Sequence, residues 1–151
     1  VFWLDADTIT HAPVPEGLLD QVLPDDKMNC FLGRDGWYHT ESGFIGFNMK
    51  HPLCGRFMKN YRNVFISGSH FTQPGWNDCY GFDAMRQLYY QQGYQDAFHN
   101  LAEGVPEGTM HPFVNTILGK YMDHRKGPRK DSSSTSKDLV EPREEAYWNG
   151  K

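Results

Sequence analysis

The sequence predicts an α/β fold, because short apolar segments typical of strands alternate with loops and with segments of helical spacing. Residues 1–4 and 43–48 carry the clearest strand patterns, and residues 53–64 and 77–92 the clearest helical ones. In sheets of this class, ligands bind beyond the carboxyl ends of the strands. The residues that follow the predicted strands are therefore the first candidates for a functional site.

Composition limits the class of protein further. The chain has 151 residues with 38% hydrophobic and 23% charged residues, which is enough for one globular domain with a real core. A net charge of −4 argues against a protein that follows a nucleic-acid backbone, so we expect no nucleic-acid partner. No apolar run approaches the ~20 residues that cross a bilayer, so we expect no membrane span.

The three cysteines are widely spaced and form no CxxC pair. This spacing argues against a structural zinc site and indicates a reducing, cytoplasmic location. Buried apolar thiols are the simplest expectation for Cys30, Cys54 and Cys79.

In the first third of the chain, residues 1–4 are apolar at every position, which predicts a strand buried on both faces. Residues 16–22 place three aliphatic side chains at helical spacing and predict a short helix. Residues 29–32 form the next predicted strand, and the glycines of 33–36 predict a turn. Residues 43–48 predict a strand whose glycines allow another group to approach closely.

Further along, residues 53–64 have apolar side chains at helical spacing. A second helix is predicted from Asn77 or Asp78 to about residue 92, ending at Gly93. We also expect helical structure over 95–101 and 114–122.

The domain organisation is predicted as a body over residues 1–130 followed by a tail over 131–151. The tail opens on a serine-rich stretch with little ability to pack, so we expect it to be flexible. Because the chain begins with Val1 directly inside a predicted strand, we expect a further segment to precede it in the natural protein.

The first functional motif is the Asp-x-Asp of Asp5 and Asp7, directly after the first apolar run. In a regular strand, two carboxylates two residues apart share a face, and a divalent cation relieves their repulsion. Hard oxygen ligands suit Mg²⁺ or Mn²⁺ bound together with phosphate oxygens. The alternative is a pair of solvated turn aspartates.

The second motif is His-x-x-Gly-x-x-Lys, formed by His124, Gly127 and Lys130. Gly127 permits a tight turn, so that Lys130 can return to the site and place its charge on a phosphate. A neutral imidazole is acceptable to Mn²⁺ and less favoured by Mg²⁺. The alternative is a basic, solvated loop after a helix.

These residues together resemble the nucleotide-sugar glycosyltransferases of the GT-A fold, most closely glycosyltransferase family 8, the glycogenin-like group. The resemblance is carried by Leu-Asp-Ala-Asp over 4–7, Glu-Ser-Gly-Phe-Ile-Gly-Phe-Asn over 41–48, and the motif over 124–130. It implies a mixed sheet flanked by helices. It also implies a metal-dependent transfer of a sugar from a nucleotide-diphosphate donor, a UDP-sugar, to the hydroxyl of a glycan or other acceptor.

The resemblance also assigns roles by position. Asp5, Asp7 and His124 would hold Mn²⁺ (or Mg²⁺), and Gly127 and Lys130 would contact the donor diphosphate. Asp78 takes the place of a family residue that contacts the donor sugar, and a helix N-cap is its equally good alternative. An acceptor hydroxyl would be oriented by Glu41 or Asp78 and stacked on aromatic side chains, for which the candidates are Trp37, Tyr38 and Trp76.

The chain departs from the family pattern in three places. No Pro-Trp follows Lys130, the expected Asn is missing before Gly43, and Cys79 replaces the usual Gln. The family's N-terminal nucleotide-binding half also has no counterpart, so the chain corresponds to the C-terminal catalytic and acceptor half. We therefore expect exposed sheet edges, through which copies of the chain would self-associate.

Two other functions fit parts of the sequence. The Asp-x-Asp after an apolar strand also resembles haloacid-dehalogenase-type phosphatases, which depend on Mg²⁺ and use the first Asp as a nucleophile. The other is a sugar-binding remnant of a glycosyltransferase that has lost catalysis.

Overall fold

A computed structural model describes residues 1–34, 40–75, 77–104, 113 and 115–124. Its centre is a four-stranded sheet in the order β1 (Phe2–Leu4), β4 (Glu41–Phe47), β3 (Asn29–Leu32) and β5 (Phe98–Asn100). Strand β4 runs antiparallel to both of its neighbours, whereas β3 and β5 are parallel. The predicted mixed α/β architecture is therefore confirmed.

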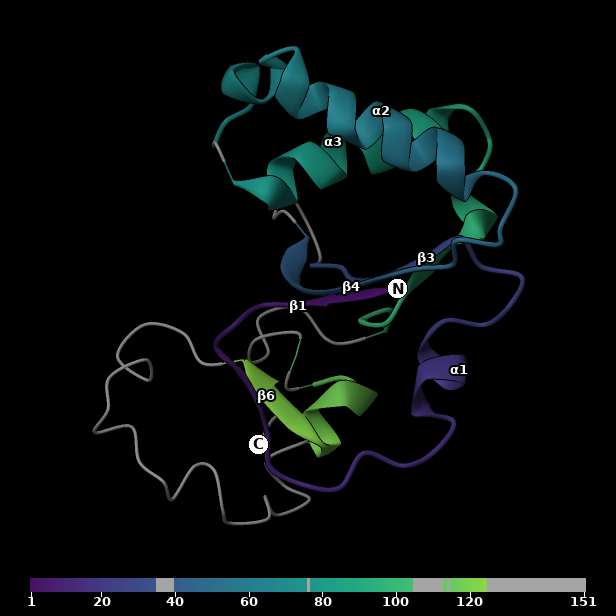
Figure 1. Cartoon of the computed structure of the whole chain (residues 1–151), viewed down its shortest axis with the longest axis vertical. Coiled ribbons are helices and arrows are strands. Elements are labelled where there is room, and N and C mark those ends of the chain that lie inside the picture. The colour runs from purple at the N-terminus through teal and green to yellow at the C-terminus, as the bar shows by residue number, and fades with distance from the viewer. Residues whose placement is uncertain (35–39, 76, 105–112, 114, 125–151) are drawn as a thin grey trace.

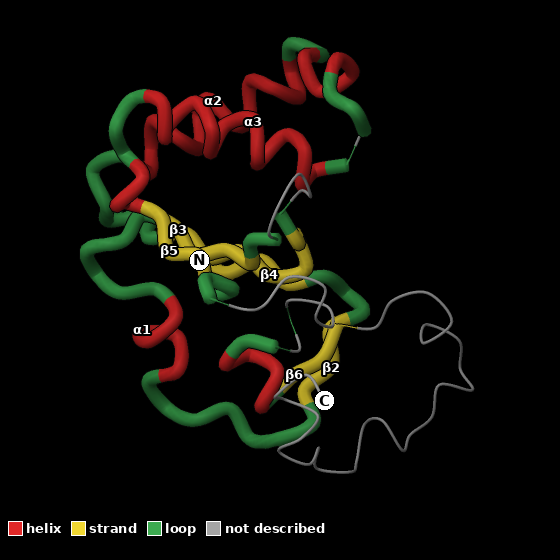
Figure 2. The backbone as a smooth tube through the Cα atoms, turned by 180° about the vertical axis from the view of Figure 1, so that it is seen from behind, coloured by secondary structure: helices red, strands yellow, loops and turns green. Residues whose placement is uncertain are grey.

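Helices and a small ribbon lie on the two faces of this sheet (Figure 1). Helices α2 (Cys54–Ile66) and α3 (Asp78–Gln91) cover one face. Helix α1 (Leu18–Val22) lies on the other, with an antiparallel ribbon of β2 (Thr8–Thr10) and β6 (Met122–His124). The view from behind shows the same three layers (Figure 2). Three 3₁₀ turns complete the described elements: η1 (Ser69–Thr72), η2 (Gln95–Ala97) and η3 (Ile117–Lys120).

The core under α2 and α3 is mainly aromatic. Phe57 is fully buried at its centre and lies 5.1–6.1 Å, centroid to centroid, from its neighbouring rings. These neighbours are Phe47, Tyr61, Phe82, Tyr89 and Phe98. Aromatic pairs in tilted and edge-to-face geometries stabilise beyond their buried area alone, so this cluster fixes both helices on the sheet.

A second core lies on the opposite face and holds the β2–β6 ribbon there. Phe44 of β4 packs edge-on against Phe113, and Leu118 and Met122 lie in the same cluster. Helix α1 contributes Leu18 and Val22, both buried. This packing determines where β6 ends and therefore where His124 lies.

The structure corrects the expected burial of the first strand. Trp3 is 56% exposed and Leu4 42% exposed, because β1 is an edge of the described sheet and is covered by β4 on one side only. Apolar content alone does not distinguish a central strand from an edge strand. An exposed apolar edge is a place where strands of another chain can pair, so the expected self-association stays a prediction.

Two further helical predictions are correct only in part, because each segment contains a short 3₁₀ helix followed by a strand. Helix α3 ends at Gln91, and Gly93 two residues later has a left-handed φ of 83°. Residues 95–97 then form η2, and residues 98–100 form β5, which pairs with β3. Within 114–122, the described residues form η3 and the start of β6, and Val114 lies outside the described residues. Long-range strand pairing overrides local helical spacing in both places.

The other local predictions are close to the structure. Strand β3 has the predicted bounds, and β4 starts two residues earlier than predicted. Helices α2 and α3 cover the two predicted helical segments, and Asn77 is the N-cap of α3. Helix α1 begins at Leu18, two residues after the predicted start, and of its three aliphatic side chains Leu18 and Val22 are buried while Leu19 is exposed. Within the described residues, no helix combines the length and apolarity needed to cross a membrane.

The aromatic core predicts a large cost for truncating its central ring. In Phe57→Ala, the free energy of unfolding should fall by about 3–5 kcal/mol, since the cavity removes contacts with five rings. Urea unfolding followed by circular dichroism measures the change. Ile66→Ala, at the exposed end of the same helix, is the control and should change it by less than about 0.5 kcal/mol. Equal losses in both variants would contradict this packing.

Burial raises the pKa of the Cys30 thiol from 9.0 to about 12. The unfolded chain then loses this proton near pH 9 while the folded chain keeps it. The thiol therefore contributes its stability fully below pH 9 and loses it as pH rises towards 12. Unfolding measured from pH 8 to 11 should show a shallower alkaline decline in Cys30→Ala than in wild type. Parallel curves would show that the thiol is not the cause.

Candidate metal centre

The centre begins at the carboxyl end of β1, where the chain turns sharply after Asp5. The Asp5 N–H donates to the Gly43 carbonyl at 3.1 Å, and the Thr8 N–H donates to the Asp5 carbonyl at 3.0 Å. This turn places Asp7 close to Asp5 although the two residues do not share a strand. The Trp3 indole N–H donates to Asp5 Oδ1 at 3.1 Å, which orients the carboxylate.

The imidazole of His124 reaches these aspartates through the β2–β6 ribbon. Thr8 of β2 pairs with His124 of β6 in the ribbon's register. His124 Nε2 lies 2.9 Å from Asp7 Oδ1 and 3.4 Å from Asp5 Oδ2. The three side chains that the sequence predicted as metal ligands lie far apart in the chain, and the fold brings them together.

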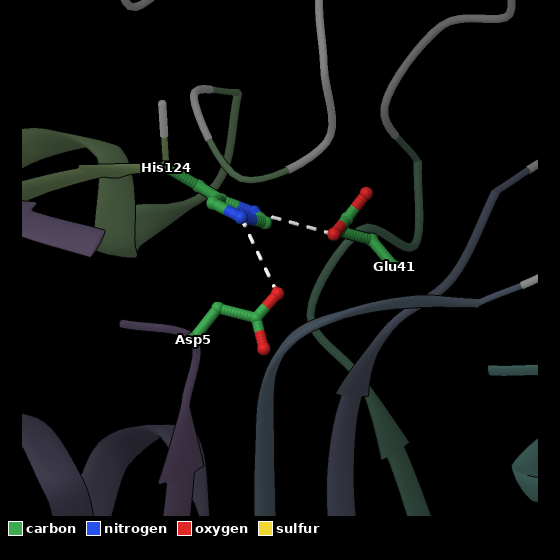
Figure 3. A group of neighbouring side chains, drawn as sticks. All are labelled: Asp5, Glu41 and His124. Carbon is green, nitrogen blue, oxygen red and sulfur yellow. Dashed lines mark ion pairs between the residues drawn. The ribbon is translucent and has the colours of Figure 1, made fainter. Parts of the chain in front are cut away.

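Glu41 approaches the same imidazole from the other side (Figure 3). Its Oε1 lies 3.3 Å from His124 Nδ1, and both side chains are only 2% exposed. The same Oε1 accepts a hydrogen bond from the Gly43 N–H at 3.1 Å. The other oxygen, Oε2, forms an ion pair with the Arg34 guanidinium.

Gly43 is needed here because the His124 ring lies directly against it. A Cβ at this position would come closer than 3.0 Å to two atoms of the ring. Real Cβ atoms do not approach so closely, so a side chain would displace the imidazole.

These groups fit a divalent cation. Asp5, Glu41 and His124 each offer a ligand atom, and these three atoms lie within 4.8 Å of one another. Cis ligands of an octahedral cation at 2.0–2.1 Å are about 3 Å apart, close to the 2.9 and 3.4 Å that separate Nε2 from the two aspartate oxygens. Two ligand sets are thus available around His124: Asp5 with Glu41, or Asp5 with Asp7 as the sequence predicted. Either set has two carboxylates and one imidazole, which suit Mn²⁺ better than Mg²⁺.

The electrostatics of the cluster also favour a cation. Among the described residues, three carboxylates surround the imidazole: those of Asp5, Asp7 and Glu41. The guanidinium of Arg34 forms an ion pair with Glu41. Bringing like charges together destabilises their charged forms, and a divalent cation offsets this repulsion.

Asp78 lies at the first turn of α3, on the other face of β4. It accepts a hydrogen bond from Ser42 Oγ at 3.2 Å, so it is tied to the residue between Glu41 and Gly43. Since Asn77 is the N-cap, Asp78 is the first helical residue and not the cap. Its expected sugar contact stays a prediction, as does the acceptor-orienting role of Glu41.

A second contact fixes this helix end. Both carboxylate oxygens of Asp83 bind Thr40, one at its N–H at 2.7 Å and the other at Oγ1 at 2.5 Å. The side chains of Thr40 and Ser42 thus bind α3, whereas the intervening Glu41 binds His124. The carboxyl end of β1, the start of β4 and the start of α3 therefore meet at one place.

Several predicted site residues lie outside the described residues. These are Gly127 and Lys130 of the second motif, the aromatic candidates Trp37, Tyr38 and Trp76, and the whole serine-rich tail. The predicted boundary between residues 130 and 131 also lies there.

The sequence did not reveal three contacts of the centre: Glu41 with His124, Arg34 with Glu41, and Trp3 with Asp5. The sequence contained one indication of the contact between Glu41 and His124: the glycine at position 43, which allows another group to approach the strand closely. The register shift beside Leu32, which pairs with Glu41, could not be inferred. Such irregularities often redirect a side chain next to a functional site.

Comparison with known proteins gives no relative that bears on this centre. No protein-family model matches the chain, and neither a curated protein nor a solved structure matches it significantly.

The contact at Gly43 predicts opposite effects for two matched substitutions. Gly43→Ala should lower the free energy of unfolding by about 1–3 kcal/mol, because its Cβ overlaps the His124 ring. Gly55→Ala in α2 meets nothing within 4 Å and should raise it by about 0.5–1 kcal/mol through helix propensity. Thermal unfolding and Mn²⁺ titration of both variants provide the measurement. If Gly43→Ala unfolded with the same free energy as wild type, His124 would not lie against this strand.

Proposed function

We propose that this protein is a metal-dependent glycosyltransferase, a hexosyltransferase that moves a sugar from a nucleotide-diphosphate donor to a hydroxyl acceptor. The observation that carries the proposal is the convergence of His124 with Asp5 and Asp7, at 3.4 Å or less. The two motifs that together resemble glycosyltransferase family 8 are separated in sequence, and His124, the first residue of the second motif, contacts both aspartates of the first. A mixed sheet flanked by helices is also the architecture that a GT-A-like protein requires.

In this proposal, Asp5, Asp7 and His124 hold Mn²⁺ (or Mg²⁺). When bound, the cation neutralises the charge that develops on the leaving diphosphate. Gly127 and Lys130 follow His124 by three and six residues, and Lys130 supplies a second positive charge to the diphosphate.

The sugar is proposed to lie towards α3. Asp78 is on the side of β4 opposite Glu41, and its carboxylate accepts a hydrogen bond from the Ser42 hydroxyl. A carboxylate in this position accepts hydrogen bonds from sugar hydroxyls. A UDP-sugar is the proposed donor, and a glycan or another hydroxyl compound the acceptor.

The proposed setting is the cytoplasm. All three cysteines are buried and unbonded to one another, and none of the pairs forms a disulfide. Thiols in this state suit a reducing compartment. Self-association would use the exposed edge of β1.

The alternative functions make different demands on Asp5. A phosphatase of the haloacid-dehalogenase type needs it as a nucleophile, whereas here its two oxygens contact Trp3 and His124. A sugar-binding remnant would bind glycan without turnover. Hydrolysis of an aryl phosphate with Mg²⁺ would favour the phosphatase, and glycan binding without a nucleotide requirement would favour the remnant.

Calorimetric titration of UDP tests the proposed function. Wild type should bind UDP with Mn²⁺ present and lose binding in EDTA. Asp7→Asn should weaken the Mn²⁺-dependent binding of UDP. Loss of a group that only supports a metal ligand costs about 10–100-fold in affinity, so loss of a ligand itself should cost at least as much. Asp20→Asn, an exposed aspartate on α1, is the matched control and should bind as wild type does. UDP affinity that is the same with Mn²⁺ and with EDTA, and the same in wild type and Asp7→Asn, would contradict the proposal.

A further inference from the structure

We propose that the outer face of α2, together with the turn η1 that follows it, is a docking surface for an anionic lipid bilayer. The surface is formed by the cations of Lys59 and Arg62 and by the apolar side chains of Ile66 and Phe71. It lies on the side of the sheet opposite to the ribbon that carries His124 (Figure 1, Figure 2). The inference goes beyond the proposed transferase activity and does not depend on it.

The first argument is the distribution of charge along the chain. Residues 42–77 contain no Asp or Glu, although the chain as a whole has a net charge of −4. In this segment Lys50, Lys59 and Arg62 are exposed, and none of the described carboxylates forms an ion pair with them. A region of positive charge in an otherwise acidic chain attracts a partner of the opposite charge.

Arg56 lies on the same helix but does not belong to this surface. Its guanidinium carbon lies 5.3 Å from the ring centroid of Tyr89 and 5.1 Å from that of Tyr94. Its Nε also donates to the Tyr89 hydroxyl at 3.3 Å. Because these contacts hold Arg56 against the aromatic core, the outward charge of α2 comes from Lys59 and Arg62.

The second argument is the apolar side chain at the end of the same helix face. Ile66 is 63% exposed. It follows Arg62 by four residues and Lys59 by seven, so the three side chains share one face of α2. The cations and the apolar end therefore meet the same partner.

The turn η1 extends this apolar end and has a defined shape. Gly68, with a left-handed φ of 76°, turns the chain after α2, and η1 contacts the helix. The His70 ring lies 3.9 Å from that of Phe71 and 5.3 Å from that of Phe65, centroid to centroid. Phe71 is 60% exposed. Neighbouring exposed apolar side chains mark an interaction surface.

Cations beside an apolar end favour a bilayer over other anionic partners. Anionic headgroups attract the basic side chains, and the apolar side chains enter the boundary between headgroups and acyl chains. A nucleic acid would use the cations alone and leave Ile66 in water. Since no described helix is long and apolar enough to cross a membrane, the contact is peripheral.

Co-sedimentation with vesicles tests this surface. Wild type should bind phosphatidylcholine vesicles that contain about 30% phosphatidylserine, and at least about tenfold more weakly those without it. Raising the salt from about 0.1 to about 1 M should release the protein, because the Debye length falls from about 10 to about 3 Å. No binding to the anionic vesicles, or equal binding to both kinds, would overturn the proposal.

A matched pair of charge reversals tests the cations. Lys59→Glu should weaken binding to the anionic vesicles by at least about fivefold, the factor that one basic residue near such a surface contributes. Lys120→Glu makes the same change in net charge on η3, which packs on the opposite face of the sheet, and should bind as wild type does. If both variants lose binding equally, only the overall charge matters and the proposal fails.

A second pair tests the apolar end. Ile66→Ala should weaken binding by at least about threefold, because apolar area that enters the bilayer is lost. Leu19→Ala truncates an exposed side chain on α1, behind the sheet, and should leave the affinity unchanged. Wild-type affinity in Ile66→Ala would overturn the proposal. Polyuridylate binding that is tighter than vesicle binding and equal in wild type and Ile66→Ala would indicate a nucleic-acid partner instead.

Hydrogen exchange of the wild-type chain decides the question even if a variant does not fold. Anionic vesicles should slow amide exchange over residues 66–72 and leave residues 18–22 of α1 unchanged. No protection, or equal protection of both segments, would overturn the proposal. Because none of these measurements uses a metal or a nucleotide, failure of UDP binding would reject the transferase function and leave the docking surface standing.

Discussion

The contact of a buried imidazole with carboxylates on both sides is the constraint on which the rest of the structure depends. His124 can occupy this position only if the β2–β6 ribbon packs against the sheet and if residue 43 has no side chain. Burying several charges together is costly unless they are paired. The Arg34 guanidinium pairs with the carboxylate of Glu41, and a divalent cation would offset the repulsion among the carboxylates.

The start of β4 connects this centre to both layers of the fold. Thr40 and Ser42 bind the first turns of α3, and Glu41, between them, binds His124. The two hydrophobic cores hold the helices and the ribbon against opposite faces of the same sheet. The start of β4 therefore links the position of α3 to the position of the His124 imidazole.

Local patterns predicted the elements that have enough residues to show a period. The helical spacing gave α2 and α3, and apolar runs gave β3 and β4. The strands β2, β5 and β6 have three residues each, which is too few to show an alternating pattern in the sequence. Each is defined by its pairing with a strand that is distant in the sequence. The exposure of Trp3 and Leu4 likewise depends on strand order in the sheet, which β1 does not encode within itself.

The sequence by itself determined which chemical groups are present. Asp5, Asp7 and His124 are oxygen and nitrogen donors in motifs that indicate a metal, whatever the fold. Only the tertiary structure decided that they meet, and that Glu41 and Arg34 stand behind the imidazole. The physical reason is that motif spacing fixes contacts over a few residues. The contact of His124 with Asp7, by contrast, depends on the β2–β6 register, and that with Glu41 on the irregular pairing of β3 with β4.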